Sequence, residues 1–301
     1  MGHCAPGIRS LLVEVAVTLA FRAEPVATSN GLGGANYLRR RVSDNVAVVK
    51  PIDEPLSKNN PKGIAGWMLG HKTRVREVTA FLLDHSGFSG IPPTTLIISH
   101  VAFRNATPRK PSTKIASIQR FFTYDFDAGD LGPYTFSVSS VHRIGILDVR
   151  LLNIHRHAGN IFVKKRGEDG GFNRYTNDGA CVAELIPIDH DLRLPEPLEE
   201  SLEDPYFQWL HWPQASVPFS DQELDYISRL DPLNDAEFLR SEPPSLTKPC
   251  LRILVLCSVF LKSAARASLS LADVGEMMTR EFLASPSTTS TSPLSTSEAM
   301  A

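Results

Sequence analysis

The chain has 301 residues, of which 42% are hydrophobic and 21% are charged, a composition typical of a globular protein with one large domain or two lobes. The formal net charge of −2 argues against a nucleic-acid-binding protein, because such proteins normally carry an excess of basic residues. The four cysteines lack C-x-x-C spacing and are too few for a disulfide scaffold, so we expect a reducing compartment, the cytoplasm.

The first apolar stretch of the chain runs from Leu11 to Phe21. Glu14 interrupts it, and it is shorter than the roughly 20 residues that a membrane span needs. A signal peptide is the minor alternative. We expect either a core strand or helix, or a segment that precedes the domain, and we assign residues 1–24 to an N-terminal extension.

A glycine-rich turn with Gly31, Gly33 and Gly34 follows and leads toward a β-branched strand that ends at Lys50. Glycines allow backbone N–H groups to approach a phosphate. The turn alone is also typical of an ordinary hairpin. A lysine at the end of the next strand, however, is what a kinase needs to hold the α- and β-phosphates of ATP, so the pattern predicts a phosphate site.

Residues 74–85 have apolar side chains at helical spacing, which predicts a helix with one buried face. That face carries Val75, Val78, Phe81 and Leu82. Glu77 falls on a different face. It either pairs with Lys50, as the corresponding glutamate does in protein kinases, or is exposed, as most helical glutamates are.

Two strands are predicted next, over residues 96–99 and from Lys114 to a linker at about Tyr124. The second contains four large apolar residues without helical periodicity, which is typical of a buried strand. They are Ile115, Ile118, Phe121 and Phe122.

Residues 138–152 predict a helix that leads into a polar loop over residues 155–160. Short apolar runs over 161–164 and 183–188 flank a glycine-rich segment, which predicts an antiparallel hairpin. Asn160 precedes the first strand and Asp189 follows the second, so both should lie at the same end of the hairpin. Oxygen ligands of this kind suit Mg²⁺, whose remaining positions are filled by substrate phosphates and water.

The loop reads His-Arg-His-Ala-Gly-Asn and resembles the Asp-Arg-His-Ala-Gly-Asn catalytic loop of phosphatidylinositol kinases, while Ile-Asp-His-Asp over 188–191 resembles their Asp-His-Gly metal motif. Further matches are Lys-Pro-Ile-Asp-Glu-Pro (50–55), Asn-Asn-Pro-Lys-Gly (59–63), Gly-Phe-Ser-Gly-Ile-Pro-Pro-Thr (87–94) and Phe-Gln-Trp-Leu-His-Trp-Pro-Gln-Ala (207–215). On these motifs the chain resembles the type II phosphatidylinositol 4-kinases, plant gamma group, from about Gly31 to about Leu283. Two positions depart from the family: His155 replaces Asp, and Asp191 replaces Gly.

The resemblance implies an α+β fold of the two-lobed protein-kinase type over residues 25–284. A small β-rich N-lobe would span about 25–122 and a mainly helical C-lobe about 123–284, with an ATP cleft between them. The implied activity is that of a transferase, a peripheral membrane enzyme that moves the γ-phosphate of ATP to the 4-hydroxyl of phosphatidylinositol with Mg²⁺. Nucleic acid is not an expected partner, and protein substrates are left open.

Carried over residue by residue, the resemblance assigns ATP binding to the glycine turn, Lys50 and Asp189, and adenine contacts to the backbone of Gln119, Arg120, Phe121 and Phe122. It assigns the catalytic loop to His155, Arg156, His157 and Asn160, together with Asp189, and Mg²⁺ to Asn160 and Asp189. His155 would accept the proton of the attacking hydroxyl in place of the family's Asp, with His157 as the other candidate base. A misplaced base would leave about 10²–10⁴-fold less activity rather than none.

Two alternatives remain at this point. The first is a weak or inactive kinase-fold protein that binds nucleotide or protein partners, since His155 brings no negative charge to the loop. The second is a metallohydrolase, because His155 and His157, at i and i+2, can face one metal together with Asp189 and His190.

The C-terminal half predicts helices over residues 224–230, after a capping box that starts at Ser220, over 251–261, and from 270 to about 282. The 251–261 segment is apolar nearly all round, as expected of a buried helix. The tryptophans of the 207–215 segment suit either a membrane interface or core packing. Residues 285–301 are rich in Ser and Thr and are expected to be disordered.

Overall fold

The computed structural model describes residues 6–21, 23, 25–27, 35–41, 44–51, 76–99, 114–153, 155–165, 183–190, 194, 206–241 and 246–280. The predicted glycine turn at Gly31, Gly33 and Gly34, the 59–63 motif, Asp191 and the Ser/Thr-rich tail lie outside these ranges. Within the described ranges, no helix is both long and apolar enough to cross a membrane.

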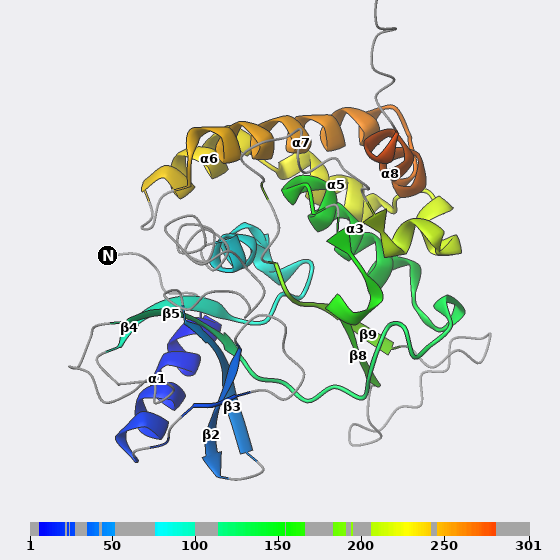
Figure 1. Ribbon diagram of the computed structural model, residues 1–301. Helices are drawn as coiled ribbons and strands as arrows, with labels where there is room; N and C mark the ends of the chain where they lie inside the picture. The colour runs from blue at the N-terminus through cyan, green and yellow to red at the C-terminus, as the bar shows by residue number, and fades with distance from the viewer. Residues whose placement is uncertain are drawn as a thin grey trace, which may run out of the picture.

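Helices and strands alternate in the first half of the chain, and helices dominate the second half (Figure 1). In order, the elements are α1 (Pro6–Ala20), β1 (Val26–Ala27), β2 (Asn36–Arg41), β3 (Asp44–Pro51), a helix over 76–83, η1 (His85–Gly87), β4 (Thr94–Ser99), β5 (Lys114–Arg120), β6 (Phe126–Asp127), η2 (Pro133–Thr135), α3 (Val138–Leu151), β7 (His155–Arg156), η3 (Ala158–Asn160), β8 (Ile161–Lys165), β9 (Ala183–Pro187), β10 (Tyr206–Phe207), η5 (Gln208–His211), η6 (Pro213–Ser216), α5 (Asp221–Arg229), α6 (Pro232–Ser241), α7 (Lys248–Arg266) and α8 (Leu271–Thr279).

The N-lobe is an antiparallel sheet with strand order β1-β2-β3-β5-β4, and α1 lies against β2 and β3 (Figure 1). Leu11 and Val15 of α1 share a hydrophobic core with Leu38, Val49 and Ile118 of the strands. The apolar N-terminal stretch is therefore a helix that shares the core of this lobe, and not the extension outside the domain to which residues 1–24 were assigned. Burying each such side chain contributes about 1.5–3 kcal/mol.

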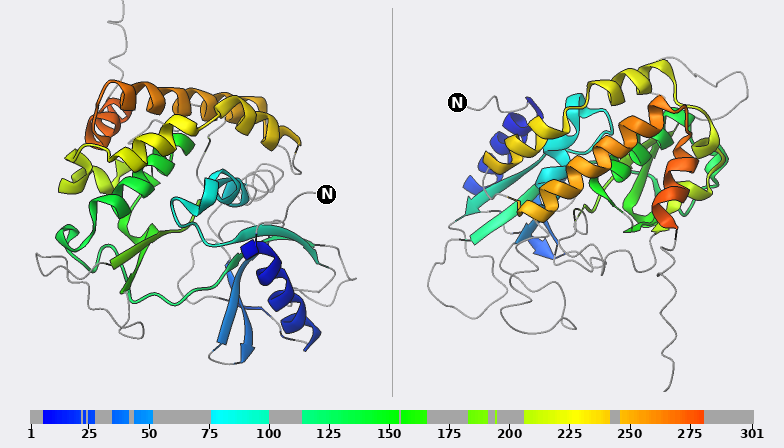
Figure 2. Two further views of the ribbon diagram at one scale, coloured as in Figure 1. Left: turned by 180° about the vertical axis from the view of Figure 1, so that it is seen from behind. Right: turned by 90° about the horizontal axis from the view of Figure 1, so that it is seen from above.

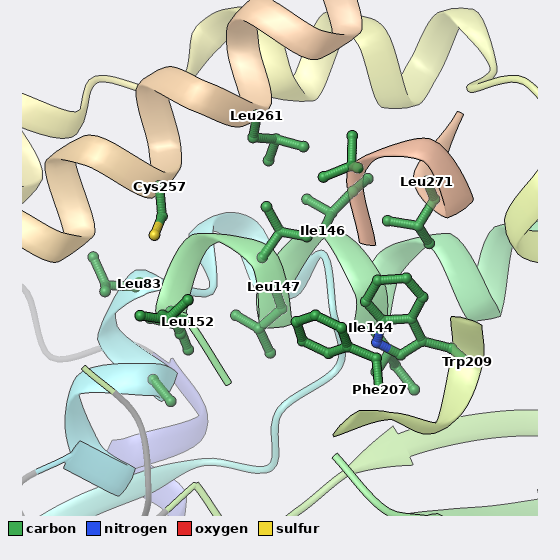
Figure 3. Packing of buried hydrophobic residues seen from close by; sticks show 14 of the residues in the cluster. Leu83, Ile144, Ile146, Leu147, Leu152, Phe207, Trp209, Cys257, Leu261 and Leu271 are labelled. Atoms are coloured by element: carbon green, nitrogen blue, oxygen red, sulfur yellow. The ribbon is translucent and has the colours of Figure 1, made fainter. Parts of the chain in front are cut away.

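The C-lobe is built around α3, which contacts α7 and α8, with α5 and α6 packed against α7 (Figure 2). Ser137 caps α3 by accepting a hydrogen bond from the Ser140 amide, and Leu152 ends it in the left-handed conformation. Side chains from α3, α7, α8 and the 207–215 segment interdigitate in one core, shown in Figure 3. This two-lobed α+β arrangement confirms the predicted fold class.

The predicted C-terminal helices are present, although α7 and α6 differ from the prediction. The capping box of Ser220 and Glu223 starts α5 as expected, and a second one starts α8 at Ser270. Helix α7 is longer than predicted and is buried on one side, because Leu256 and Val259 on its outer side are exposed, so the prediction of burial all round was wrong. Helix α6 was not predicted.

Both tryptophans of the 207–215 segment are buried in the C-lobe core. Trp209 is 0% and Trp212 5% exposed, and Trp212 contacts the Phe136 ring at 4.9 Å. Core packing is therefore their role, and the membrane-interface alternative for these two side chains was wrong.

Candidate active site

Lys50 joins the two lobes at the end of the N-lobe strand β3. Its side chain is 14% exposed and donates to the carboxylates of Glu77 and Asp189, the latter at 3.2 Å from Asp189 Oδ1. Glu77 comes from the helix over 76–83 and Asp189 from the end of the β8–β9 hairpin. Three segments far apart in the sequence therefore meet at one ammonium group.

Glu77 is 3% exposed, so the predicted pairing with Lys50 is present and the alternative of an exposed glutamate is excluded. Ser117 Oγ donates to its second oxygen at 3.3 Å. The predicted buried face is present in part: Phe81 and Leu82 pack against the C-lobe core but are half-buried, as is Val78, while Val75 lies outside the described residues. The side chains that are buried instead are Arg76, Glu77, Thr79, Ala80 and Leu83. The helix packs between two lobes and buries polar residues that the apolar periodicity does not mark.

Asn160 and Asp189 lie at the same end of the antiparallel hairpin, as predicted. Ile161 pairs with Pro187 in the β8–β9 register, and the Ile188 amide donates to the Asn160 carbonyl at 3.0 Å. Asp189 has φ = 52°, in the left-handed region that non-glycine residues rarely adopt. Such conformations persist where the surrounding structure imposes them, and they cluster at active sites.

The loop between α3 and β8 separates its polar side chains between the surface and the interior. His157 is exposed, His155 is half-buried, and Arg156 is 0% exposed. Arg156 Nη1 donates to the main-chain carbonyls of Asn160 and Ile188, each at 2.8 Å. Although the resemblance placed Arg156 among the catalytic residues, its buried guanidinium is out of reach of a substrate and holds the loop instead.

Part of the segment predicted to contact adenine is hydrogen-bonded within the N-lobe sheet. The amide of Arg120 donates to Pro93 O at 2.8 Å, that of Phe121 donates to Val46 O at 3.0 Å, and Gln119 lies between β3 and β4. The Arg120 side chain binds Glu14 of α1 at 3.1 Å. Gln119 and Arg120 form the end of β5 and the Phe121 amide is still bonded to β3, so the linker between the lobes starts at Phe122.

Aromatic rings line this linker. Tyr124 stacks on Phe162 of β8 with ring centroids 3.7 Å apart, and Phe122 lies 5.9 Å from the same ring. Burial, with smaller contributions from Tyr37 and Asp127, raises the pKa of Tyr124. The amides of Phe122, Thr123 and Tyr124 make no hydrogen bond within the described part of the chain, so their N–H groups are available to a planar heterocycle. Tyr124 and Phe162 were not predicted, because neither stands in a recognisable motif.

The residues at the hairpin end suit a hard divalent cation. The Asp189 side chain is 44% exposed beside Lys50, and Asn160, which lies at the same end of the hairpin, is half-buried, so the two residues offer a carboxylate and an amide oxygen. This donor set fits Mg²⁺ completed by phosphate oxygens and water. Among the described residues no three His, Cys, Asp or Glu side chains form a metal cluster, and His190 is 1% exposed, so nothing supports the metallohydrolase alternative.

Comparison with known proteins places these residues in one family. The family model described as "Phosphatidylinositol 3- and 4-kinase" matches residues 43–274. The chain is 51% identical over 293 residues to "Phosphatidylinositol 4-kinase gamma 8" of Arabidopsis thaliana, covering 93% of this chain and 54% of that protein. It is 51% identical over 296 residues to "Phosphatidylinositol 4-kinase gamma 1" of the same plant, covering 93% and 51%. It is also 38% identical over 278 residues to "Phosphatidylinositol 4-kinase gamma 4" of Oryza sativa subsp. japonica, covering 85% and 45%. The chain thus spans about half the length of the curated relatives it matches.

Proposed function

Because the chain belongs to the phosphatidylinositol 3- and 4-kinase family, we propose that it transfers the γ-phosphoryl group of ATP to the 4-hydroxyl of phosphatidylinositol. The observation that carries this proposal is the position of Lys50, whose ammonium contacts both Glu77 and Asp189. A kinase needs this cation for the α/β-phosphates, a glutamate to hold it, and a metal-binding aspartate beside it.

The residues then divide the work of phosphoryl transfer, which consists mainly of positioning and charge stabilisation. Lys50 holds the ATP phosphates and keeps them next to Asp189. Asn160 and Asp189 hold Mg²⁺, which supplies positive charge to the phosphate oxygens when it is bound. Adenine lies along the linker residues Phe122–Tyr124, where the unused amides and the Phe162 ring support it.

His155 orients the attacking hydroxyl and accepts its proton through a neutral imidazole ring. It lies on β7, paired in parallel with Tyr206 of β10, and is half-buried. The pairing fixes the His155 backbone next to Arg156, whose side chain is buried and hydrogen-bonded. The exposed His157 is the second candidate for this role.

We place the enzyme at the membrane surface, as a peripheral protein on the cytoplasmic side, because its lipid substrate resides there. Helix α1 supports this placement. The helix exposes Leu12, Val13 and Val17, and Phe21, which directly follows it, is 80% exposed. Co-sedimentation with phosphatidylinositol-containing vesicles tests it, and loss of binding in Val17→Ser/Phe21→Ser is the expected result.

The test of function is radiolabelled phosphate transfer from ATP to phosphatidylinositol in detergent micelles, with the phosphorylated position identified by chromatography of the headgroup. Wild type should yield the 4-phosphate. Asp189→Asn keeps the size of the side chain but removes its charge, so it should lose Mg²⁺-dependent transfer. Wild-type rates in Asp189→Asn at saturating Mg²⁺ would contradict the assignment of Asp189.

A weak or inactive kinase-fold protein is the second candidate, and the histidine at position 155 is the observation that favours it. It predicts that ATP raises the melting temperature while neither lipid nor protein is phosphorylated. Under that reading His155→Asp, which restores the family's carboxylate, should raise transfer by one or more orders of magnitude.

A further inference from the structure

Asp148 is a fully buried carboxylate on α3 that binds three different segments. It accepts from Arg156 Nε at 3.0 Å (to Oδ2) and from Arg156 Nη2 at 2.9 Å (to Oδ1). Asn153 Nδ2 donates to Oδ1 at 2.6 Å, and Trp209 Nε1 donates to Oδ2 at 3.0 Å. A buried ion pair is tolerated when additional hydrogen bonds satisfy its remaining atoms, and here they come from α3's own C-terminal turn and from η5.

The other end of Arg156 reaches the candidate metal site through the main chain. Its Nη1 bridges the carbonyls of Asn160 and Ile188, the second of which directly precedes Asp189. One guanidinium therefore joins the start of β8 to the end of β9, the two strand ends that carry the proposed Mg²⁺ ligands at the same end of the hairpin. Because the Asp148 carboxylate fixes the rotation of this guanidinium, it also fixes where those two carbonyls lie.

Trp209 of η5 donates to the same oxygen of Asp148, Oδ2, as Arg156 Nε. Its ring is 0% exposed, stacks on Phe207 with centroids 4.6 Å apart, and lies so close to α8 that a Cβ at Gly275 would be 3.0 Å from it. The ring is therefore packed between Phe207 and α8. The segment over 207–215, which the proposed chemistry leaves without a task, thus supplies a rigid hydrogen-bond donor.

We infer that Asp148 and Trp209 are positioning residues, acting through Arg156 to set the relative placement of Asn160 and Asp189. This inference rests on the proposed function, since it takes those two residues as the metal ligands. Outer-shell partners of metal ligands typically change metal affinity by about 10–100-fold when mutated. We expect about 10-fold for Asp148→Asn and about 3-fold for Trp209→Phe, because Trp209 lies one step further away.

The experiment measures Mn²⁺ binding by electron paramagnetic resonance in the presence of a non-hydrolysable ATP analogue. Analogue binding is measured separately in EDTA. Trp209→Phe is the principal variant, because it removes one N–H group and leaves the buried charges paired. Trp212→Phe is the matched control, a buried tryptophan of the same segment with no bond to Asp148, and Glu223→Gln controls for the loss of a buried carboxylate elsewhere on the C-lobe.

The expected result is weaker Mn²⁺ binding in Trp209→Phe and Asp148→Asn, with wild-type binding in both controls and unchanged analogue affinity in EDTA. Wild-type Mn²⁺ affinity in folded Trp209→Phe and Asp148→Asn would overturn the inference and leave the proposed function intact. Equal losses in Trp209→Phe and Trp212→Phe would also overturn it, because the loss would then be general. Absence of Mn²⁺ binding and of phosphate transfer in wild type would overturn the proposed function, and the inference with it.

Discussion

Two buried Arg–Asp pairs start from nearby positions on α3 and hold different segments of the candidate active site. Asp148 pairs with Arg156 at 2.9 Å, and Arg150 pairs with Asp235 of α6 at 2.8 Å, with all four side chains at most 5% exposed. The first pair holds the main chain beside the proposed metal ligands. In the second, Arg150 Nη1 donates to Leu83 O at 2.8 Å, at the end of the helix that carries Glu77.

The two pairs differ in their contact with exposed groups and in how fully their hydrogen-bond donors are satisfied. Asp235 also contacts His85, whose side chain is 42% exposed, and Arg150 Nε has no partner within the described part of the chain. Both side chains of the Asp148 pair are 0% exposed, and the hydrogen bonds of Arg156 reach the main chain at Asn160 and at Ile188. The two pairs are alike in burial and charge. Their roles therefore differ through the main-chain carbonyls that the other N–H groups of each arginine bind.

Removing the acid from either pair is expected to have the largest effect on stability. Asp148→Ala and Asp235→Ala should each lower the free energy of unfolding by about 3–5 kcal/mol, because each leaves a guanidinium buried without its partner. Urea denaturation measures both. The exposed pair Arg229–Asp225 is the control, and Asp225→Ala should cost at most about 1 kcal/mol. A loss of that small size in either core variant would contradict the account.

A substitution at Gly145 tests how tightly α3, the helix from which both pairs start, packs against α8. A Cβ at this position would overlap the side chain of Leu271, which is 0% exposed, so Gly145→Ala should lower stability by about 1–3 kcal/mol despite the better helix propensity of Ala. Gly132→Ala, where nothing lies within 4 Å of the new atom, should change stability by less than about 0.5 kcal/mol. Equal melting temperatures for Gly145→Ala and wild type would show that the contact between α3 and α8 can relax.

A third buried pair on α3 serves as a reference for the other two, because neither of its residues contacts any residue of the candidate active site that the structure describes. His142 Nδ1 lies 3.1 Å from Glu223 Oε2, and both side chains are at most 4% exposed. Burial alone would raise the pKa of Glu223, but hydrogen bonds with His142 and Ser220 together bring it below its ordinary value of 4.5. The pair should therefore stabilise the fold without affecting metal binding.

The sign of this effect on stability follows from proton linkage. Since the folded carboxyl holds its proton less tightly than the unfolded one, its contribution is complete above about pH 4.5 and is lost as the pH falls through the folded pKa. Thermal unfolding between pH 7 and pH 3 should show a weaker acid dependence in Glu223→Gln than in wild type. An unchanged slope would mean that other carboxyls dominate acid unfolding.

The sequence predicted those parts of the site that lie on regular elements. The β8–β9 hairpin follows from two apolar runs around a glycine-rich segment, and antiparallel pairing then places Asn160 and Asp189 at one end. The Lys50–Glu77 pair was one of two alternatives, because helical periodicity does not reveal which polar face a second lobe will cover. The choice required the tertiary structure.

The brace around Asp148 could not be predicted, since its partners come from residues 153, 156 and 209 and periodicity carries no information on such contacts. One signal was present: Asp148 and Arg150 are the two charged residues in the otherwise apolar run from Ile144 to Leu151. A carboxylate in a buried stretch needs a partner. The start of the linker was also misplaced, because the amides of Arg120 and Phe121 bind neighbouring segments whose proximity is a property of the folded sheet.

The proposed function places the ATP phosphates where Lys50, Glu77 and Asp189 meet. Calorimetric titration of Mg-ATP into wild type, Lys50→Ala and Lys248→Ala tests it directly. Lys248 is an exposed lysine at the start of α7 and should not matter. We predict that Lys50→Ala weakens binding by about 1–3 kcal/mol, the size of a charge-assisted contact, while Lys248→Ala binds like wild type. Equal affinity in wild type and a folded Lys50→Ala variant would contradict the claim.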